Sequence, residues 1–331
     1  MRKIQTPRIA VLGGGTGLSS MLRGLKTRSD NITAIVTVTD DGGGSGVLRR
    51  ELKMPPPGDI RNCIQALANA EPVMQEVLNY RFREGTLAGQ SLGNLVLAAL
   101  YDMSPTFDRA VAAMSQVLAI TGQVLPVTNE NLVLQARFSD GAVICGETAI
   151  THYKRITDAV IDRVMLDPPR PPALPEVLEA IREADMIVLG PGSLYTSVIP
   201  NLLIEGVADA VCASNAVKVY VMNIMTQDGE TEGYTAAHHV RALLRHGGEN
   251  LFRHVLINDL SIPDDIRRNY LRENAVPVTT DGAELRAMGL SPVFAPVAMW
   301  KGGLIRHDPP ALADALMDLY YRNAATRTAR T

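Results

Sequence analysis

Glycines fill the end of the first apolar run of this sequence, just before a stretch with helical periodicity. The run that begins at residue 9 ends in Gly13, Gly14, Gly15, Thr16 and Gly17. Glycine at a strand-to-helix turn permits positive φ angles and lets a ligand approach the backbone closely. The N–H groups and the positive dipole end of a following helix attract anions. The sequence therefore favours a phosphate-bearing ligand at this loop, and a tight turn without a ligand is the alternative.

The spacing of these glycines does not match the dinucleotide fingerprint. That fingerprint requires G-x-G-x-x-G between a strand and a helix. Counted from Gly13 its last position is Leu18, and counted from Gly15 it is Ser20. We therefore expect no NAD site here.

A second glycine loop follows the next apolar run and begins with two acids. Asp40 and Asp41 precede Gly42 and Gly43. Paired carboxylates after a strand suit Mg²⁺ or the hydroxyls of ribose or another sugar. Asp-Gly sequences also form Asx turns, in which the carboxylate binds its own backbone. Both interpretations stay open, and the predicted position at the carboxyl edge of a sheet favours a site.

Polar residues also begin two predicted helices. Asp59 is expected to be the N-cap of a helix over residues 59–69. Arg61 and Asn62 then lie in its first turn, where an arginine opposes the helix dipole. Arg61 therefore faces either a bound anion or solvent. Asn94 is the polar start of an apolar helical stretch.

The last cluster follows the apolar run at residues 186–189. Glycines and hydroxyl residues precede a helix predicted over residues 200–213, a composition that suits phosphate or sugar oxygens. The next strand also ends in small polar residues. The residues of these two strand ends are Gly190, Pro191, Gly192, Ser193, Tyr195, Thr196 and Ser197, and then Asn223, Thr226 and Gln227. Several such strand ends together predict one ligand crevice along one sheet edge.

Motifs for the common nucleophiles and metals are missing from the sequence. No G-x-S-x-G elbow occurs, and no Walker A lysine follows a glycine loop. His238 and His239 have no third spaced ligand, and we expect a surface or capping pair. We therefore assign no catalytic residue and leave the metal unassigned, with Mg²⁺ at the acidic loop as an open possibility.

The elements that carry these loops alternate between strands and helices. Apolar runs rich in Val and Ile predict strands, and amphipathic stretches predict helices. The predicted strands cover residues 9–12, 32–39, 186–189, 217–223, 255–258 and 276–278, and the helices cover 18–25, 59–69, 200–213, 236–244 and 264–273. This alternation is typical of parallel βαβ units in an open, doubly wound α/β sheet.

The middle of the chain has a different pattern. Residues 105–120 have a helical pattern, and strand-like runs then flank a Ser-Asp-Gly turn at residues 139–141, an antiparallel signature. Five prolines within residues 167–176 form a stiff connector. We predict one α/β domain over residues 1–322, with an inserted helix and β segment at about 103–166, and a flexible tail over 323–331.

Composition limits the classes of function. The chain has 331 residues, 46% of them hydrophobic, and a formal net charge of -3. No Lys/Arg block stands out, which argues against nucleic acid or a membrane surface as the main partner. The three cysteines are far apart, and no signal peptide or transmembrane run is present. We expect a cytoplasmic protein that does not insert into a membrane.

Six motifs of the sequence together resemble one family. They read GGGTGLSSMLRGLK, VTVTDDGGGSGVLRRE, PPGDIRNC, SLGNLVLAAL, ADMIVLGPGSLYTSVIPNLL and NIMTQDGETEGYT, and they are similar to those of the YvcK group of gluconeogenesis factors. This group shares a superfamily with the CofD-like 2-phospho-L-lactate transferases. The likeness runs from about residue 9 to residue 316. Gly44 departs from it, because the family usually has a hydroxyl residue there, so we expect no contact at that position.

The resemblance implies a Rossmann-like, doubly wound, mostly parallel sheet and a nucleotide-sugar ligand. That ligand is UDP-N-acetylglucosamine or UDP-glucose, and no cofactor is required. The implied role is regulation of gluconeogenic growth, cell-wall precursor supply and cell shape, through an unidentified cytoplasmic or cell-wall regulatory protein. A homodimer stays open.

The transferase branch of the superfamily supplies the alternative function. Its members move a phospholactyl group from a nucleotide-linked donor to a deazaflavin, with Mg²⁺. Aromatic residues make up only 5% of this chain, with one Trp. They offer little stacking surface for a flat deazaflavin, which favours the regulator.

Two carboxyl-terminal stretches, DIRRNYLRENAVPV and LIRHDPPALADAL, also resemble the YvcK group. They point to Tyr270 and Arg306 as ligand contacts. The Tyr270 ring either stacks on uracil or packs in the core. Arg306 either holds a pyrophosphate through two parallel hydrogen bonds, which lysine cannot copy, or pairs with a nearby acid such as Asp308.

Overall fold

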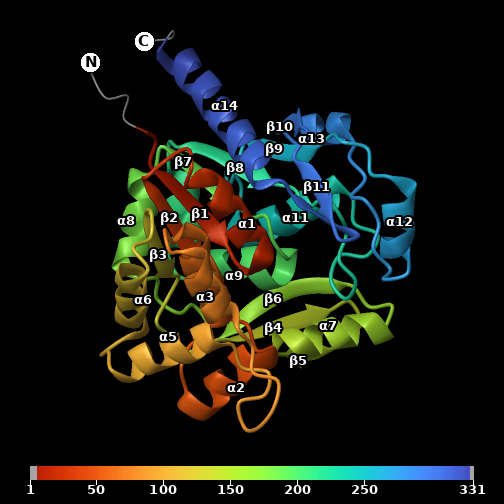
Figure 1. Ribbon diagram of the computed structural model, residues 1–331. Coiled ribbons are helices and arrows are strands. Elements are labelled where there is room, and N and C mark those ends of the chain that lie inside the picture. Colours follow the sequence, from red (N-terminus) through yellow and green to blue (C-terminus); the bar gives the residue numbers. More distant parts are fainter. Residues whose placement is uncertain (1–5, 329–331) are drawn as a thin grey trace.

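Seven parallel strands form the central sheet of the protein (Figure 1). The structure is a computed structural model that describes residues 6–328. The strands are β1 (Ile9–Gly13), β2 (Ile32–Val36), β3 (Gln123–Pro126), β7 (Met186–Leu189), β8 (Val217–Val221), β9 (His254–Asn258) and β10 (Ser291–Ala295). Their order is β10-β9-β8-β7-β1-β2-β3, and each neighbouring pair is parallel. Strands are added outward from β1 in both directions, which confirms the predicted Rossmann-like, doubly wound fold.

Helices bury the strands of this sheet. All residues of β1 and β7 are buried, and their sequences IAVLG and MIVL place no polar side chain in water, as expected for a parallel sheet covered on both faces. The helices on one face are α1 (Gly15–Leu25), α3 (Gly58–Leu67) and α14 (Pro309–Thr328). Those packed together on the other face are α8 (Pro175–Glu183), α9 (Ile199–Leu202), α10 (Val207–Ala213) and α11 (Ala236–Gly247).

The predicted antiparallel insertion is a three-stranded sheet below the main one (Figure 1). Its strands are β4 (Val133–Phe138), β5 (Val143–Cys145) and β6 (Ile161–Asp167), in the order β5-β4-β6. The predicted turn at residues 139–141 joins β4 to β5. Helix α7 (Glu147–Ile156) packs on β4 and β5.

Both outer strands of the main sheet differ from the sequence interpretation. β3 was expected in the insertion, but it pairs with β2, and its Val124 and Leu125 are buried in the main core. The strand predicted over residues 276–278 is wrong. That segment makes only isolated bridges, because Pro277 has no N–H to add to a ladder. The outer strand is β10 instead.

The helix predicted over residues 200–213 is also wrong as one element. A π-helical turn, η1 (Leu194–Val198), leads directly into α9, and α10 starts only after a break. Gly206 ends that break with a φ of 81°, a left-handed conformation that glycine adopts without strain.

The remaining elements extend the domain around this core. They are α2 (Gly43–Leu52), α4 (Pro72–Asn79), α5 (Leu92–Asp102), α6 (Phe107–Val117), α12 (Asp264–Leu271), α13 (Gly282–Ala287) and the hairpin of β11 (Ala298–Lys301) and β12 (Leu304–His307). α14 continues through residues 323–328, where we predicted a flexible tail, and residues 329–331 of that tail lie outside the described part. Within residues 6–328, none of the helices combines the length and the apolar character needed to cross a bilayer.

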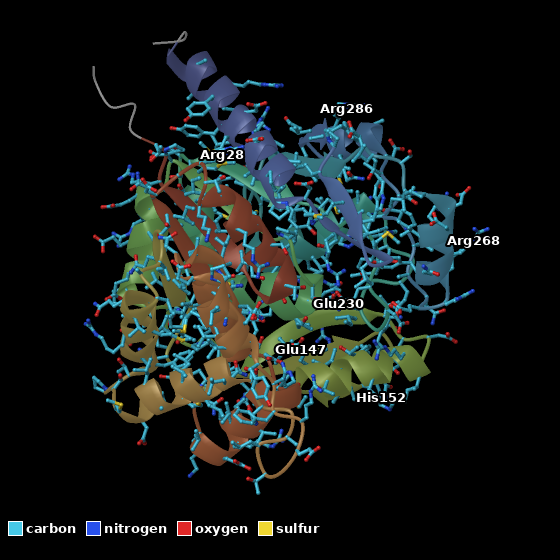
Figure 2. The ribbon with its side chains drawn as sticks, viewed as in Figure 1. Arg28, Glu147, His152, Glu230, Arg268 and Arg286 are labelled. Atoms are coloured by element: carbon cyan, nitrogen blue, oxygen red, sulfur yellow. The ribbon has the colours of Figure 1, made fainter. Side chains whose placement is uncertain are left out.

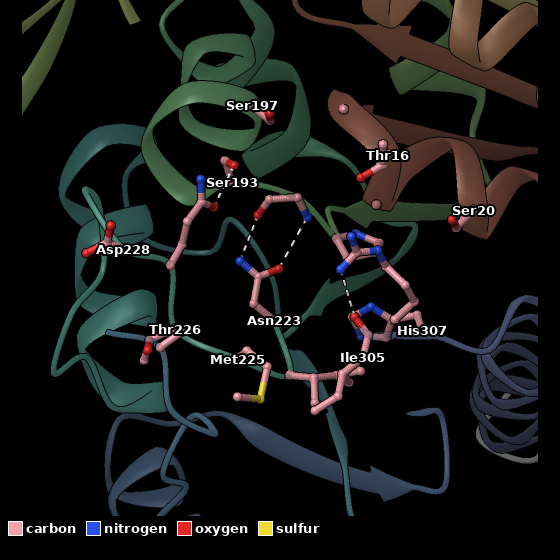
Figure 3. Close-up of a pocket in the computed structure, with 18 of the residues that line it drawn as sticks. Thr16, Ser20, Ser193, Ser197, Asn223, Met225, Thr226, Asp228, Ile305 and His307 are labelled. Atoms are coloured by element: carbon pink, nitrogen blue, oxygen red, sulfur yellow. Dashed lines mark hydrogen bonds between the residues drawn. The ribbon is translucent and has the colours of Figure 1, made fainter. Parts of the chain in front are cut away.

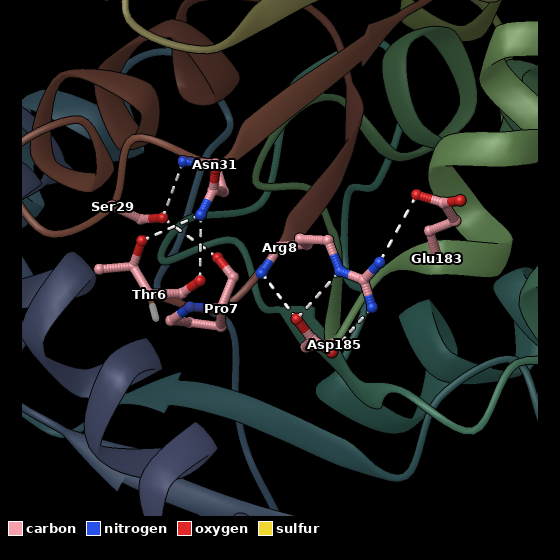
Figure 4. Close-up of polar contacts among 7 residues, drawn as sticks. All are labelled: Thr6, Pro7, Arg8, Ser29, Asn31, Glu183 and Asp185. Atoms are coloured by element: carbon pink, nitrogen blue, oxygen red, sulfur yellow. Dashed lines mark hydrogen bonds and ion pairs between the residues drawn. The ribbon is translucent and has the colours of Figure 1, made fainter. Parts of the chain in front are cut away.

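Polar contacts fasten the amino ends of β1 and β7 together (Figure 4). The backbone N–H of Arg8 donates to Asp185 at 2.9 Å, and its guanidinium reaches the same carboxylate at 3.3 Å. Glu183 adds a second ion pair at 3.5 Å. The two central strands are thereby aligned, so that their carboxyl ends, which carry the glycine loops, lie side by side.

Candidate functional site

A cleft of about 560 Å³ opens at the carboxyl ends of β1, β7 and β8 (Figure 3). The strand order reverses between β1 and β7, and ligands of open α/β sheets bind at such a switch point. The loop after β1 and the loop after β7 meet there. The cleft therefore lies where the sequence predicted a crevice.

The structure brings more than half of the predicted site residues to this cleft. Those that line it are Gly14, Gly15, Thr16, Gly17, Pro191, Gly192, Ser193, Ser197, Asn223, Thr226, Gln227, Tyr270 and Arg306. Those that do not are Gly13, Asp40, Asp41, Gly42, Gly43, Asp59, Arg61, Asn62, Asn94, Gly190, Tyr195 and Thr196. The first set comes from five separate segments of the chain.

The two glycine loops are in direct backbone contact. A Cβ atom at Gly17 would lie 2.7 Å from the carbonyl oxygen of Pro191 and 3.2 Å from the backbone nitrogen of Gly192. Glycine at this position therefore allows the start of α1 to pack against the loop after β7.

Gly17→Ala is expected to lower the free energy of unfolding by about 1–3 kcal/mol, because the added methyl group must push two backbone segments apart. Gly13→Ala is the matched control, because its Cβ would meet only Leu18 at an ordinary contact distance of 3.7 Å. Urea denaturation of both variants measures the difference. Equal stability of the two would show that the loops move apart without strain.

The N-terminus of α1 has no side-chain cap. Its N-cap residue, Gly14, has an extended backbone and no side chain that could accept a hydrogen bond from the first turn. The N–H of Gly15 donates to the Asp59 carboxylate. Thr16 and Gly17 follow in the first turn and line the cleft. Backbone N–H groups of a first turn have no partner within the helix, so this turn can bind an anion.

The N-terminus of η1 is already occupied by an internal carboxylate. Glu230 accepts hydrogen bonds from the backbone N–H groups of Leu194, Tyr195 and Thr196 at 3.2, 2.9 and 3.0 Å. The side chain is 1% exposed. The interpretation of this helix start as a phosphate site is therefore wrong for these three N–H groups. Their donors are satisfied from within the protein.

Burial sets the charge state of Glu230. It raises the pKa of this carboxyl to about 7, and the three N–H groups oppose that rise. Glu147, half-buried at the start of α7, is close enough to interact electrostatically with Glu230 (Figure 2). The pKa of Glu147 is also raised well above its ordinary value by burial and by the neighbouring carboxylates.

The acidic loop makes turn and capping contacts. Asp40 accepts from the N–H of Gly42 at 2.9 Å, which is Asx-turn geometry. Asp41 accepts from the N–H and the hydroxyl of Thr148 at 3.0 and 2.7 Å, and so ties this loop to α7. Gly42 and Gly43 begin α2. The structure thus places the loop beside the insertion rather than along the cleft.

Asp59 is not an N-cap, contrary to the prediction. Helix α3 starts one residue earlier, and Pro57 is its N-cap. The Asp59 carboxylate lies behind the first glycine loop, 2.7 Å from where a Cβ of Gly14 would be. Burial, and secondly the Asp40 carboxylate, raises the pKa of Asp59 to about 6.

The prediction that Arg61 faces an anion or solvent is wrong as well. Its side chain is 7% exposed and donates to Asn94, Gln65 and Asn79 at 3.1, 3.3 and 3.0 Å. These amide oxygens come from α3, α4 and α5, so Arg61 joins three helices. Asn94 is its buried partner, and Asn62 lies on the same helix outside the cleft lining.

Another wall of the cleft comes from α12 and the β11–β12 hairpin, whose strand β12 packs beside α1. The hydroxyl of Tyr270 accepts from the N–H of Ile305 at 2.7 Å and lies 3.3 Å from its carbonyl oxygen. The exposed Arg306 contacts the same carbonyl at 2.9 Å. His307 is buried beside them, and burial lowers its pKa to about 4. The pairing of Arg306 with Asp308, the alternative to a ligand role, is absent from the described contacts.

Nine further residues line the cleft that the sequence patterns did not predict. They are Ser20, Arg155, Ile224, Met225, Asp228, Glu273, Ala275, Ile305 and His307. Ser20 lies three residues after Gly17, so helical periodicity alone could have identified it. Arg155 has no such signal, because it comes from the insertion and reaches the cleft through an ion pair with Asp228 at 2.7 Å.

The two consecutive histidines have separate roles. His238 forms a capping box with Thr235 at the start of α11. The capping role predicted for the histidine pair is therefore confirmed for His238. His239 is fully buried, so the surface part of that prediction is wrong. In the part of the chain that the structure describes, no group of three or more His, Cys, Asp or Glu side chains is arranged to hold a metal ion.

Comparison with known proteins gives consistent results along almost the whole chain. The family model of 2-phospho-L-lactate transferase CofD matches residues 9–298. The chain is 50% identical over 316 residues to the gluconeogenesis factor of Bacillus subtilis, covering 95% of this chain and 98% of that protein. It is 44% identical over 311 residues to the gluconeogenesis factor of Halalkalibacterium halodurans, covering 94% and 95%. A crystal structure of a Bacillus halodurans protein matches with a TM-score of 0.91 at 43% identity, covering 95% of this chain and 100% of that chain.

Proposed function

This chain belongs to the CofD family of 2-phospho-L-lactate transferases and, within it, to the gluconeogenesis factors, and on that basis we propose that it is a regulator of gluconeogenic growth that binds a UDP-sugar in the cleft. UDP-N-acetylglucosamine and UDP-glucose are the ligands we propose. The observation that carries the proposal is the first turn of α1, where Thr16 and Gly17 line the cleft at the switch point of the sheet together with Arg306.

The diphosphate is proposed to bind at α1 rather than at η1. The N–H groups of η1 are held by Glu230, whereas Thr16 and Gly17 begin an uncapped helix. The Asp59 carboxylate accepts only from the N–H of Gly15, so the N–H groups of Thr16 and Gly17 are the ones proposed to bind a phosphate group. The guanidinium of Arg306 supplies the positive charge, with two parallel donors toward phosphate oxygens.

The base and the sugar are proposed to occupy the two ends of the cleft. The Tyr270 ring offers a stacking surface for uracil, and its hydroxyl already bonds to Ile305. Ser193, Thr226 and Asp228 offer hydroxyl and carboxylate groups for the sugar. Asn223 exchanges hydrogen bonds with Gly192 at 3.3 and 2.8 Å and so fixes the loop between them.

A transferase acting on a nucleotide-linked donor is the alternative function. It is supported by the family model, which is that of a phospholactyl transferase. Among the described residues that line the cleft, Tyr270 and His307 are the aromatic rings. Two rings on one wall give little surface for a flat deazaflavin acceptor, so we favour the regulator.

UDP-N-acetylglucosamine is expected to raise the melting temperature, and NAD is not. At about one hundred times its dissociation constant, a ligand adds about 2.7 kcal/mol to the stability of the folded state. For a chain of this size, that corresponds to a shift of roughly 5 °C. Thermal melts with UDP, UDP-glucose, UDP-N-acetylglucosamine, GDP and NAD, with and without Mg²⁺, make the comparison. Stabilisation by NAD alone, or by none of the UDP compounds, would reject the proposal.

The broader role is proposed from the same family membership. We propose a cytoplasmic location, control of cell-wall precursor supply and cell shape, and an output through another regulatory protein. Binding of the UDP-sugar would report the supply of this precursor to that partner.

A further inference from the structure

A second cavity of about 390 Å³ lies beside η1. It is bounded by the start of β6, by the segment that precedes α11 and by α11 itself. η1 separates it from the cleft, since Ser197 lines the cleft and Tyr195 lines the second cavity. Its volume falls within the range of small-molecule sites. Neither the proposed UDP-sugar nor the contacts that hold the cleft account for it.

Two tyrosine hydroxyls meet in this cavity. The oxygens of Tyr195 and Tyr234 are 2.9 Å apart. In such a pair, only one of the two protons lies between the oxygens, and the second proton needs another acceptor. Among the described residues, neither hydroxyl has a second hydrogen-bond partner. Burial raises the pKa of both phenols, so both stay protonated near neutral pH. The pair thus has a hydrogen-bond donor to offer.

Two carboxylates, Asp162 and Glu232, and two arginines, Arg241 and Arg245, line the cavity. Glu232 pairs with Lys154 at 3.3 Å. Counted together with their ion-pair partners Arg137, Lys154 and Glu284, these groups are four cations and three carboxylates, so positive charge exceeds negative charge. The Asp162 carboxylate pairs with two arginines, Arg137 at 2.7 Å and Arg245 at 2.6 Å. One carboxylate cannot neutralise both guanidinium groups, and Arg245 lines the cavity. Arg241 lines it too, although it also pairs with Glu284 at 2.5 Å.

The walls between the phenol pair and this rim are apolar. Ile161 and Ala242 are buried there, and Val160 is 44% exposed at the opening. An apolar body buried against these side chains would gain hydrophobic stabilisation. A fully hydrated inorganic ion would not use these walls.

We propose that the second cavity binds a small organic anion, with a flat apolar body against Val160 and Ile161 and a carboxylate or phosphate group that accepts from the phenol pair and Arg245. This site is distinct from the cleft and does not depend on the proposed UDP-sugar. Because Tyr195 belongs to η1, the bound anion would contact the same helical turn that carries Ser197 into the cleft.

Phenyl phosphate is the probe that tests this site, with inorganic phosphate as the comparison without an apolar body. We expect titration calorimetry on the full chain to detect phenyl phosphate binding that is at least about fivefold tighter than binding of inorganic phosphate. Tyr234→Phe should weaken phenyl phosphate binding at least fivefold. Val160→Trp, which fills the opening without removing a hydrogen bond, should abolish it. These losses should leave UDP-N-acetylglucosamine binding detectable.

Two control variants locate the binding. Tyr153→Phe removes a hydroxyl that bonds to Asp140 outside the cavity, and it should bind phenyl phosphate like the wild type. Arg306→Ala, in the cleft, should do so as well. The proposal is overturned if phenyl phosphate does not bind, if Val160→Trp binds it normally, or if Arg306→Ala abolishes binding. Failure of UDP-N-acetylglucosamine to bind would reject the proposed function and leave this result standing, since the two ligands are titrated separately.

Discussion

Glu230→Ala is expected to lower the melting temperature of the ligand-free protein by roughly 10 °C. The substitution removes the acceptor of three buried backbone N–H groups, those of Leu194, Tyr195 and Thr196. A buried donor without an acceptor is unfavourable by about 1–3 kcal/mol, so the total is on the order of 5 kcal/mol. At roughly 2 °C for each kcal/mol, this gives the expected shift in a differential scanning calorimetry experiment.

The pH dependence of this effect provides a second readout. The pKa of Glu230 is raised from 4.5 to about 7 in the folded state. The folded protein therefore binds more protons at this site than the unfolded chain between these values, and its stabilising contribution is lost as pH rises through about 7. The stability difference between the wild type and Glu230→Ala should thus be larger near pH 5 than near pH 8.

Glu205→Ala is the matched control for the loss of a glutamate. Glu205 makes an exposed ion pair with Arg170 at 2.9 Å, and its side chain is 50% exposed. Exposed pairs contribute about 0–1 kcal/mol, so its melting temperature should stay near that of the wild type. If both variants melted together, the three hydrogen bonds to Glu230 would not stabilise η1 as argued.

Tyr270→Ala and Arg306→Ala are each expected to reduce the affinity for UDP-N-acetylglucosamine at least about tenfold, or about 1.4 kcal/mol. Both residues line the cleft together with the first turn of α1. Arg306→Lys should recover little, because an ammonium group cannot form the paired donors of a guanidinium. Tyr270→Phe should lose less than Tyr270→Ala, since it keeps the ring and loses only the hydroxyl contact to Ile305. Titration calorimetry measures each affinity.

Ligand-free melts separate a binding role from a structural one in these variants. Arg170→Ala removes an exposed arginine that is not part of the cleft lining and should bind like the wild type. Wild-type affinity in both alanine variants would place Tyr270 and Arg306 outside the site. Loss of a cooperative melt would show that the hairpin contact, rather than the ligand, explains the effect.

The sequence predicted the parts of this fold and site that depend on local patterns. The glycines after β1 and β7 could be identified because strand ends and helix starts are adjacent in sequence, and the parallel sheet brings them together. The edge strands β3 and β10 could not be placed in this way, because the composition of a short apolar run does not determine which strand it pairs with. Glu230 has no local signal, since its partners in η1 lie more than thirty residues earlier in the chain. Arg61 was misassigned for the same reason, because two of its three amide partners, Asn79 and Asn94, come from other helices.

The cleft is assembled from segments near both ends of the chain, and this has a consequence for biosynthesis. Its α1 wall is among the first segments to be synthesised, whereas Arg306 and His307 are among the last. Contacts between distant segments require both segments to have been synthesised, and they form slowly because closing the long loop between them costs entropy. A growing chain on the ribosome would therefore present the glycine loop long before it could add the wall that carries Arg306 and His307. Ligand capture would mark the end of folding, so that the cell's supply of ligand would favour completed molecules over partly synthesised ones.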